Sequence, residues 1–285
     1  MIISNAKEGS TEIDFYRPLR LQDVDSIMQH SASDALFLAG GMTAMPYLNR
    51  REWSTSCIVS LGRVEELQGI HLKDDYIVIG ASATHTEIAE SHHVNTHCPV
   101  LSASARGVGD MQVRNRGTMG GVVAFANSGA DYLSVLTAVD ALVVLWRAGR
   151  RRRIPIRSFI TGERATLLER CEVIEAVEIS RDETRRAHFL RLTRVQGAPP
   201  ILTIAGSVCA DERVLCIGGA TPSPNLLGEE LFDADAAAVR RLVLASISSP
   251  FGDAHAPGAY RRNMAAEYAV RILKELTDNF KDVLG

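Results

Sequence analysis

Residues 114–131 have the sequence RNRGTMGGVVAFANSGAD, and this stretch decides how the chain is interpreted. It combines the hydroxyl of Thr118 with the adjacent glycines Gly120 and Gly121 and, further on, with the carboxyl group of Asp131. Glycines lack a Cβ atom, so their backbone N–H groups can approach a charged ligand closely. We therefore expect this segment to contact a bound dinucleotide.

A second segment with the same chemistry lies upstream. The apolar run ALFLA at residues 35–39 leads directly into GGMTA at residues 40–44, which predicts a strand that ends in a tight glycine turn. A single Gly-Gly pair is more often only a turn, but two such turns, each with a threonine, can hold one pyrophosphate from two sides. Neither the Gly-Lys-Ser/Thr ending of the P-loop nor the G-x-G-x-x-G dinucleotide fingerprint is present.

Composition narrows the class of protein. The chain has 285 residues, of which 46% are hydrophobic and 23% charged, and this is typical of a globular protein with two or three domains. Its net charge of -3 gives no general attraction to nucleic acid or anionic lipid. No long apolar run is present and the N-terminus lacks a basic region followed by an apolar one, so we expect a cytoplasmic protein without a membrane span.

Three groups of reactive side chains have ordinary explanations. Residues 92–98, HHVNTHC, include zinc-binding residue types, but their irregular spacing and Pro99 favour a surface loop at the end of a helix. The arginines at residues 150–153 follow a predicted hairpin turn and have little aromatic interleaving, which favours a solvated turn or a subunit contact over nucleic-acid binding. The cysteines lack any Cys-x-x-Cys pair, so we expect buried, reduced thiols and no metal site. They are Cys57, Cys98, Cys171, Cys209 and Cys216.

The predicted elements indicate an α+β fold. The first third alternates helices and strands, whereas strand patterns dominate from residue 173 and two amphipathic helices close the chain. We expect an N-terminal α/β subdomain at residues 1–60, a second subdomain at residues 61–175 and a C-terminal α+β domain at residues 176–285. Strands are predicted at residues 35–39, 57–61, 76–80, 141–145, 173–179, 201–209 and 214–217, and helices at residues 21–28, 84–87 with a capping box, 99–106, 132–138, 234–247 and 260–276.

Short motifs along nearly the whole chain resemble the FAD-binding subunit of the molybdenum hydroxylases, the family of xanthine dehydrogenase and carbon monoxide dehydrogenase. They occur in the order found in that family, which makes the resemblance specific. The matching stretches are FYRP at residues 15–18, AGGMT at 39–43, SLGRVEEL at 60–67, IGA at 79–81, THTE at 84–87, RNRGTMGG at 114–121, IGGA at 217–220 and YRR at 260–262.

The resemblance implies two α/β subdomains that clasp FAD, in the FAD-binding type 2 (PCMH-like) arrangement, followed by a C-terminal three-stranded antiparallel sheet with helices. Asp131 would be repelled by phosphates, so we place it at ribityl or ribose hydroxyls. Ile174, on a strand of the C-terminal part, is expected against the flavin, and Arg191 falls near the family's basic residue. The implied FAD-binding residues are Ala39, Gly40, Gly41, Met42, Thr43, Ala44, Thr118, Met119, Gly120, Gly121, Val122, Ala124, Phe125, Asp131, Ile174 and Arg191.

Four positions depart from the family pattern. Val122 replaces an Asn, Met42 stands where Thr, His or Gln is frequent, and the GAPP sequence at residues 197–200 replaces a stretch that often carries an acidic residue. Ser128 replaces a usual Pro, and we expect it to loosen the turn before Asp131. The departures leave the pyrophosphate loops intact and change the contacts expected around the flavin ring.

The resemblance also implies the division of labour in a complex. This chain would take electrons from the [2Fe-2S] clusters of a small subunit and pass them through FAD to an external acceptor. A large subunit with the molybdenum cofactor would hydroxylate the substrate, in a dimer of heterotrimers. No catalytic nucleophile, general base or metal ligand is expected in this chain. The alternatives are a stand-alone FAD-dependent oxidoreductase and an assembly module that has lost flavin.

Overall fold

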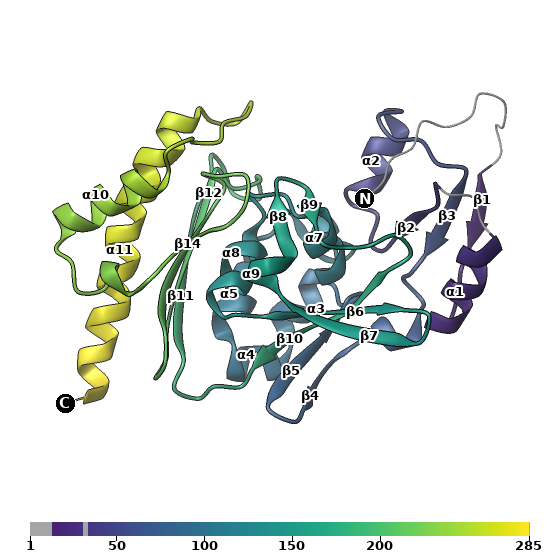
Figure 1. Cartoon of the computed structure of the whole chain (residues 1–285), viewed down its shortest axis with the longest axis horizontal. Coiled ribbons are helices and arrows are strands. Elements are labelled where there is room, and N and C mark those ends of the chain that lie inside the picture. The colour runs from purple at the N-terminus through teal and green to yellow at the C-terminus, as the bar shows by residue number, and fades with distance from the viewer. Residues whose placement is uncertain (1–12, 31–33, 285) are drawn as a thin grey trace.

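The three larger β-sheets follow one another along the long axis of the molecule, each with its own helices (Figure 1). The computed structural model describes residues 13–30 and 34–284, with side chains up to residue 277. We call residues 13–60 the N-terminal lobe, residues 61–180 the middle lobe and residues 181–284 the C-terminal lobe. No helix in this described part combines the length and the apolar composition needed to cross a membrane.

The N-terminal lobe is a small parallel sheet in the order β1-β3-β2, with a helix in each crossover. The helical spacing seen in the sequence buries Leu21 and Val24 beneath the sheet, and Val59 in β3 is fully buried with them. The predicted helix and both strands are therefore confirmed. The elements are β1 (Asp14–Tyr16), α1 (Leu21–His30), β2 (Leu36–Leu38), α2 (Ala44–Asn49) and β3 (Cys57–Ser60).

The middle lobe is a five-stranded antiparallel sheet in the order β4-β5-β10-β6-β7, with helices packed on one face (Figure 1). Thr84 opens α3 with the predicted capping box, and Pro99 occupies the first turn of α5 as expected. The strands are β4 (Ile70–Lys73), β5 (Tyr76–Gly80), β6 (Leu142–Arg147), β7 (Arg150–Pro155) and β10 (Val173–Ser180), with a small hairpin of β8 (Ile160–Gly162) and β9 (Ala165–Thr166). The helices are η1 (Glu65–Leu67), α3 (His85–Glu90), α4 (His92–His97), α5 (Pro99–Gly107), α6 (Met111–Arg114), α7 (Met119–Phe125), α8 (Asp131–Ala138) and α9 (Ile156–Phe159).

Strand β10 corrects the placement of Ile174. The strand pairs antiparallel with both β5 and β6, so it lies in the centre of the middle sheet, and Ile174 does not belong to the C-terminal part. The expected boundary at residue 175 falls inside this strand. Alternating apolar and polar residues identified a strand here, but the alternation contains no information on which sheet the strand joins.

The arginines at residues 150–153 lie on strand β7 and not in a turn, because the hairpin turn occupies residues 148–149. Three of them reach over β6 and pair with glutamates at 2.6–2.7 Å, and each guanidinium donates two hydrogen bonds to its carboxylate. The pairs are Arg151 with Glu175, Arg152 with Glu172, and Arg153 with Glu178. These ion pairs neutralise most of the positive charge of the four consecutive arginines.

The C-terminal lobe contains the expected antiparallel sheet, whose three long strands are joined by a short fourth strand at the edge. Two helices pack against it, and their apolar faces form a separate core with residues such as Leu202, Leu215 and Ile272. The elements are β11 (Arg186–Leu192), β12 (Leu202–Val208), β13 (Arg213–Gly218), β14 (Asn225–Leu227), η2 (Glu229–Leu231), α10 (Ala236–Ser246) and α11 (Gly258–Leu284).

The N-terminal and middle lobes share one hydrophobic core. Trp146 from β6 and Val173 from β10 are buried together with Leu21 and Val24 from α1. The backbone N–H of Ala148, in the β6–β7 turn, also donates to the carboxylate of Asp25 at 3.2 Å. This side of the lobe interface is therefore closed by packing.

Two expectations about local chemistry need correction. Residues 92–97 form the short helix α4 and not a loop. In the described parts of the chain, these residues and the other histidine, cysteine and acidic side chains form no group of three or more that could hold a metal ion. Three of the cysteines are buried as expected, but Cys171 and Cys209 are only half-buried.

Candidate cofactor site

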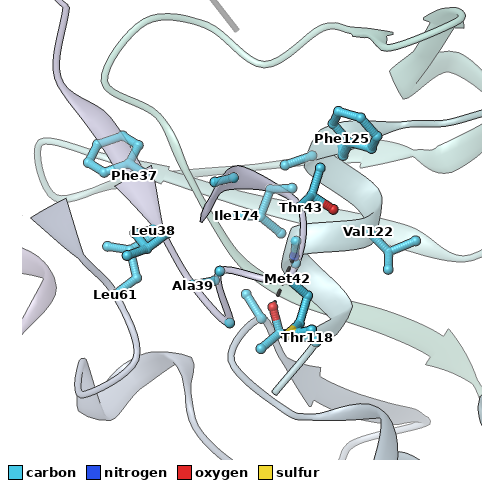
Figure 2. Close-up of a pocket in the computed structure, with 18 of the residues that line it drawn as sticks. Phe37, Leu38, Ala39, Met42, Thr43, Leu61, Thr118, Val122, Phe125 and Ile174 are labelled. Atoms are coloured by element: carbon cyan, nitrogen blue, oxygen red, sulfur yellow. Dashed lines mark hydrogen bonds between the residues drawn. The ribbon is translucent and has the colours of Figure 1, made fainter. Parts of the chain in front are cut away.

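A cleft of about 650 Å³ lies between the N-terminal and middle lobes. Its walls come from the loop after β2, the start of α7, the residues before β10 and the 197–200 segment of the C-terminal lobe. Figure 2 shows Thr118 and Val122, at the start of α7, next to the loop that carries Met42 and Thr43. The volume lies within the range of roughly 300–1,000 Å³ that is typical of ligand pockets.

The first glycine loop has open backbone donors. Strand β2 ends at Leu38, and the chain turns at Gly41, whose φ of +76° is accessible to glycine at little cost. The Gly41 carbonyl then accepts from the Met45 N–H at 3.0 Å as α2 begins. Within the described chain, the N–H groups of residues 40–44 have no hydrogen-bond acceptor. Consecutive open amides in a tight turn are suited to binding an anion.

The second glycine loop differs from the expectation. Thr118 caps helix α7, and its hydroxyl oxygen accepts from the Gly121 N–H at 3.2 Å. The Gly120 N–H donates to the carbonyl of Ala81 at 2.8 Å, and a methyl group on Gly120 would come within 2.7 Å of the Ala81 Cβ atom. The amides of both glycines are thus already bonded. The Thr118 hydroxyl, in contrast, still has its hydrogen to donate.

The two loops touch directly. A methyl group on Gly40 would overlap the carbonyl oxygen of Arg116. The backbones of the two loops are therefore in direct contact, with no space for a side chain between them. The next residue, Gly117, accepts a hydrogen bond from the backbone N–H of His85 at 3.1 Å, which fixes the second loop to the start of α3. The structure therefore brings the two predicted loops together in one cleft.

Asp131 lies at the start of α8, lines the cleft and is 5% exposed. Arg191 Nε is 3.0 Å from Asp131 Oδ1, but neither atom makes a hydrogen bond of good geometry, so the contact is Coulombic. Burial raises the pKa of Asp131 to about 6, and Arg191 offsets this only in part. Arg191 instead donates to the carbonyls of Gly107 and Ala198. Asp131 Oδ1 is thus a buried acceptor without a donor, next to the cleft.

The buried imidazole of His85 is a feature that the sequence reasoning missed. Its Nδ1 lies 3.0 Å from the hydroxyl of Tyr132, and the two rings meet edge to face. Burial, and to a smaller degree the charge of Arg114, lower the pKa of His85 to about 4. A neutral imidazole therefore supports the second loop from behind. The capping box marked the start of α3, but no sequence signal showed where this side chain points.

Of the residues expected to bind FAD, most line the cleft and two do not. Met119, the first residue of α7, is fully buried, and Arg191 lies behind Asp131, so neither lines the cleft. Val122 is half-buried and contributes only apolar surface. The expected residues that do line the cleft are Ala39, Gly40, Gly41, Met42, Thr43, Ala44, Thr118, Gly120, Gly121, Val122, Ala124, Phe125, Asp131 and Ile174.

Several lining residues were not anticipated. Phe37 and Leu38 from β2, Leu61 after β3 and Trp53 in the connection between α2 and β3 all line the cleft. The apolar pattern predicted the strands, but the pairing and twist of the sheet decide which side chains face the cleft.

The turn before Asp131 is held more firmly than expected. The backbone N–H of Ser128 donates to Glu163 Oε2 at 2.9 Å, a bond that a proline at this position cannot make. The side-chain amide of Asn127 donates to the other oxygen of Glu163 at 3.0 Å. The expectation that Ser128 loosens this turn is therefore wrong, because Glu163 on the β8–β9 hairpin restrains it.

A cleft between two lobes, with a glycine loop on each side, is the arrangement that the sequence predicts for a dinucleotide-binding protein. A family model described as the FAD binding domain in molybdopterin dehydrogenase matches residues 11–181. The chain therefore belongs to this family. It is an FAD-binding subunit of the medium-chain type in the molybdenum hydroxylases, which are oxidoreductase complexes.

Individual relatives agree with this assignment. The carbon monoxide dehydrogenase medium chain of Hydrogenophaga pseudoflava is 32% identical over 166 residues, which cover 58% of this chain and 58% of that protein. The nicotine 6-hydroxylase medium subunit of Paenarthrobacter nicotinovorans is 28% identical, over 92% of this chain and 96% of that protein. A solved structure of the Hydrogenophaga pseudoflava carbon monoxide dehydrogenase that lacks the Mo-pyranopterin moiety of the molybdenum cofactor has a TM-score of 0.81 and 25% identity, over 92% of this chain and 96% of that chain. The expected fold class is confirmed.

Proposed function

We propose that this chain is the electron-transfer subunit of a molybdenum-containing hydroxylase, with FAD bound between its N-terminal and middle lobes. It would take electrons from the [2Fe-2S] clusters of a partner subunit and pass them to an external acceptor. The observation that carries the proposal is the meeting of the open amides of residues 40–44 with the Thr118 hydroxyl in one cleft.

The residues present fit FAD at three points. The amides of residues 40–44 can donate to the pyrophosphate, and the Thr118 hydroxyl can donate from the opposite side. Asp131 Oδ1 faces Arg191 but has no hydrogen-bond donor, so the carboxylate can provide an acceptor for a ribityl or ribose hydroxyl. The remaining wall is largely apolar and includes Ile174, which suits a planar ring system.

The flavin supplies the redox chemistry when it is bound, and the chain's own residues have the tasks of binding, orientation and exclusion of water. The glycine loops orient the diphosphate. Asp131 fixes the sugar or ribityl chain, and the 197–200 segment covers part of the cleft on the side of the C-terminal lobe. We name no catalytic acid, base or nucleophile in this chain.

The FAD-binding set that we propose differs from the sequence-based set in the role of individual residues. Gly120 and Gly121 act through close packing and helix capping, and Met119 and Arg191 support the site from behind. We also propose three segments, in which the boundary expected at residue 175 moves past the end of β10 to residue 180.

The partners that we propose are a small subunit with [2Fe-2S] clusters and a large subunit with the molybdenum cofactor, in a cytoplasmic dimer of heterotrimers. The names of the relatives as medium chains or medium subunits support this. A role in binding nucleic acid is not proposed, because the basic residues of β7 are paired with glutamates.

The proposal is tested by isolating the tagged chain from its native host. We expect FAD in the purified material, together with one iron-sulfur subunit and one molybdenum subunit. A chain that holds FAD but has no such partners would indicate a stand-alone flavoprotein. A chain that co-purifies with both subunits but neither contains nor accepts FAD would indicate an assembly module.

A further inference from the structure

Aromatic and arginine side chains from both lobes meet beside the cleft. Tyr47 in α2 stacks on Trp53, with ring centroids 4.5 Å apart and ring planes 14° apart. Phe125 at the end of α7 lies 6.3 Å from each of these rings. The guanidinium of Arg164, in the turn between β8 and β9, lies 4.9 Å from the Phe125 ring and 5.8 Å from the Tyr47 ring. We call Tyr47, Trp53, Phe125 and Arg164 the rim cluster.

The backbone of the N-terminal lobe fixes its half of the rim cluster. The N–H groups of Glu52 and Trp53 both donate to the carbonyl of Tyr47, at 2.9 and 3.3 Å. This turn places the indole ring of Trp53 on the Tyr47 ring. The two aromatic side chains thus form one unit attached to α2.

The middle lobe fixes the other half. The Arg164 N–H donates to the carbonyl of Ala126 at 2.9 Å, directly after Phe125, and the neighbouring Glu163 carboxylate holds Ser128 and Asn127. The Arg164 side chain is 46% exposed, so it covers the two rings from the solvent side. Phe125 and Arg164 are therefore attached to the turn that leads to Asp131.

The rim cluster and the hydrophobic core shared by the N-terminal and middle lobes lie on different sides of the lobe interface, and they join the lobes in different ways. Trp146 and Val173 join the two lobes through buried packing, which cannot part without exposing apolar surface. The rim cluster joins the same lobes through half-exposed ring contacts, and its members Trp53 and Phe125 line the cleft. Figure 1 shows α2 facing α7 and the β8–β9 hairpin, away from the contact between α1 and the β6–β7 turn. Any opening of the cleft by relative motion of the lobes must therefore separate the rim cluster.

We propose that the rim cluster holds the two lobes together over the bound cofactor and that Arg164 is a positioning residue that slows the release of FAD. This inference rests on the proposed FAD site. Cation–π contacts at exposed sites contribute about 0.5–1 kcal/mol each, and a contact that must break before release affects the dissociation rate more than the association rate. Loss of the Arg164 contact should therefore accelerate FAD release by about two- to fivefold.

Arg50 provides the matched control. Its guanidinium also lies over the Tyr47 ring, at 5.1 Å, but it belongs to the same lobe as Tyr47. Removal of Arg50 thus deletes a cation–π contact of the same kind without deleting a contact between lobes.

The test compares FAD release from the wild-type chain, Arg164→Gln and Arg50→Gln, after mixing with an excess of a flavin-scavenging apoprotein. We expect faster release from Arg164→Gln and unchanged release from Arg50→Gln. Without FAD, the melting temperature of either variant should fall by only about a few degrees. Equal release rates for the wild-type chain and Arg164→Gln would overturn the inference and leave the FAD site intact. A wild-type chain that binds no FAD would overturn the proposed function and this inference with it.

A second variant covers the case in which Arg164→Gln does not fold. Tyr47→Leu removes the ring that Arg164 and Phe125 contact from the other lobe. We expect it to release FAD faster as well, and in the double variant the two effects should combine to less than their product, since both changes break the same contact. A Tyr47→Leu variant with wild-type release would contradict the role of the rim cluster.

Discussion

The Cα atom of Gly40 lies against the carbonyl oxygen of Arg116, in a space that no Cβ atom can share. This contact joins the loop after β2 in the N-terminal lobe to the loop before α7 in the middle lobe. It sets the width of the cleft between them, because both loops line it.

A Gly40→Ala substitution is expected to push the two loops apart. Overpacking typically costs about 1–3 kcal/mol, so we expect the affinity for FAD to fall by about 5- to 150-fold. Titration of the chain with FAD, followed by quenching of flavin fluorescence, measures this change. Gly62→Ala is the control, since a methyl group on Gly62 has no neighbour within 4 Å. Similar losses for the two variants would contradict the importance of the loop contact.

Gly120 and Gly121 are adjacent, but we expect substitutions at the two positions to have different effects. A methyl group on Gly120 would meet the Ala81 Cβ atom at 2.7 Å, whereas one on Gly121 would meet only the Thr118 hydroxyl oxygen, at 3.0 Å. Gly120→Ala should therefore reduce the free energy of unfolding by about 1–3 kcal/mol even without FAD, and Gly121→Ala by less. The free energies of unfolding of both variants, measured by denaturant unfolding, test this difference. A larger loss for Gly121→Ala would show that the roles assigned to the two residues are wrong.

The Thr118 hydroxyl is expected to act both as a helix cap and as a ligand donor. Thr118→Val keeps the shape of the side chain but removes the acceptor for the Gly121 N–H, so the free energy of unfolding should drop by about 1 kcal/mol. The affinity for FAD should drop in addition, because the donor to the phosphate is lost. Thr118→Ser should retain both properties. The role as a ligand donor would be refuted by a Thr118→Val chain that is less stable but binds FAD as tightly as wild type.

Asp131 should make the stability of the flavin-free chain depend on pH. Its pKa is about 6 in the folded chain, above the ordinary value of 3.8, so between about pH 4 and pH 6 the folded chain binds more protons than the unfolded chain. The contribution of Asp131 to the free energy of unfolding therefore falls as the pH rises through this window. Asp131→Asn should remove this component, which unfolding curves at several pH values will show.

The same carboxyl group should make FAD binding depend on pH in the opposite direction. Only the ionised carboxylate accepts through both oxygens, so affinity should increase as the pH rises through about 6 and then level off. In Asp131→Asn this dependence should be absent. A wild-type affinity that stays constant from pH 5 to pH 7 would show that Asp131 does not contact the cofactor.

The sequence was sufficient to predict the two loops, since glycine pairs and threonines directly constrain backbone geometry. Thr84 and Pro99 marked helix starts correctly, because capping and proline preferences are local properties. The pairing of strands that are distant in the sequence could not be predicted in the same way. The pattern of β10 identified a strand but not its neighbours, so Ile174 was assigned to the wrong sheet.

The site contains further features that no local pattern encodes. The bond from Ser128 to Glu163 joins residues 35 positions apart, and the rim cluster combines side chains from three separate segments. The glycine amides of α7 appeared available in the sequence, but Ala81 and Thr118 already bind them in the fold. Such contacts depend on the tertiary arrangement.

The central claim is that the loops at residues 40–44 and 116–121 enclose the diphosphate of one FAD molecule. The most direct measurement is a crystal structure of the chain with FAD. We predict the diphosphate within hydrogen-bond distance of the amides of residues 40–44 and of the Thr118 hydroxyl. A diphosphate elsewhere on the molecule, with both loops free of ligand, would contradict the account.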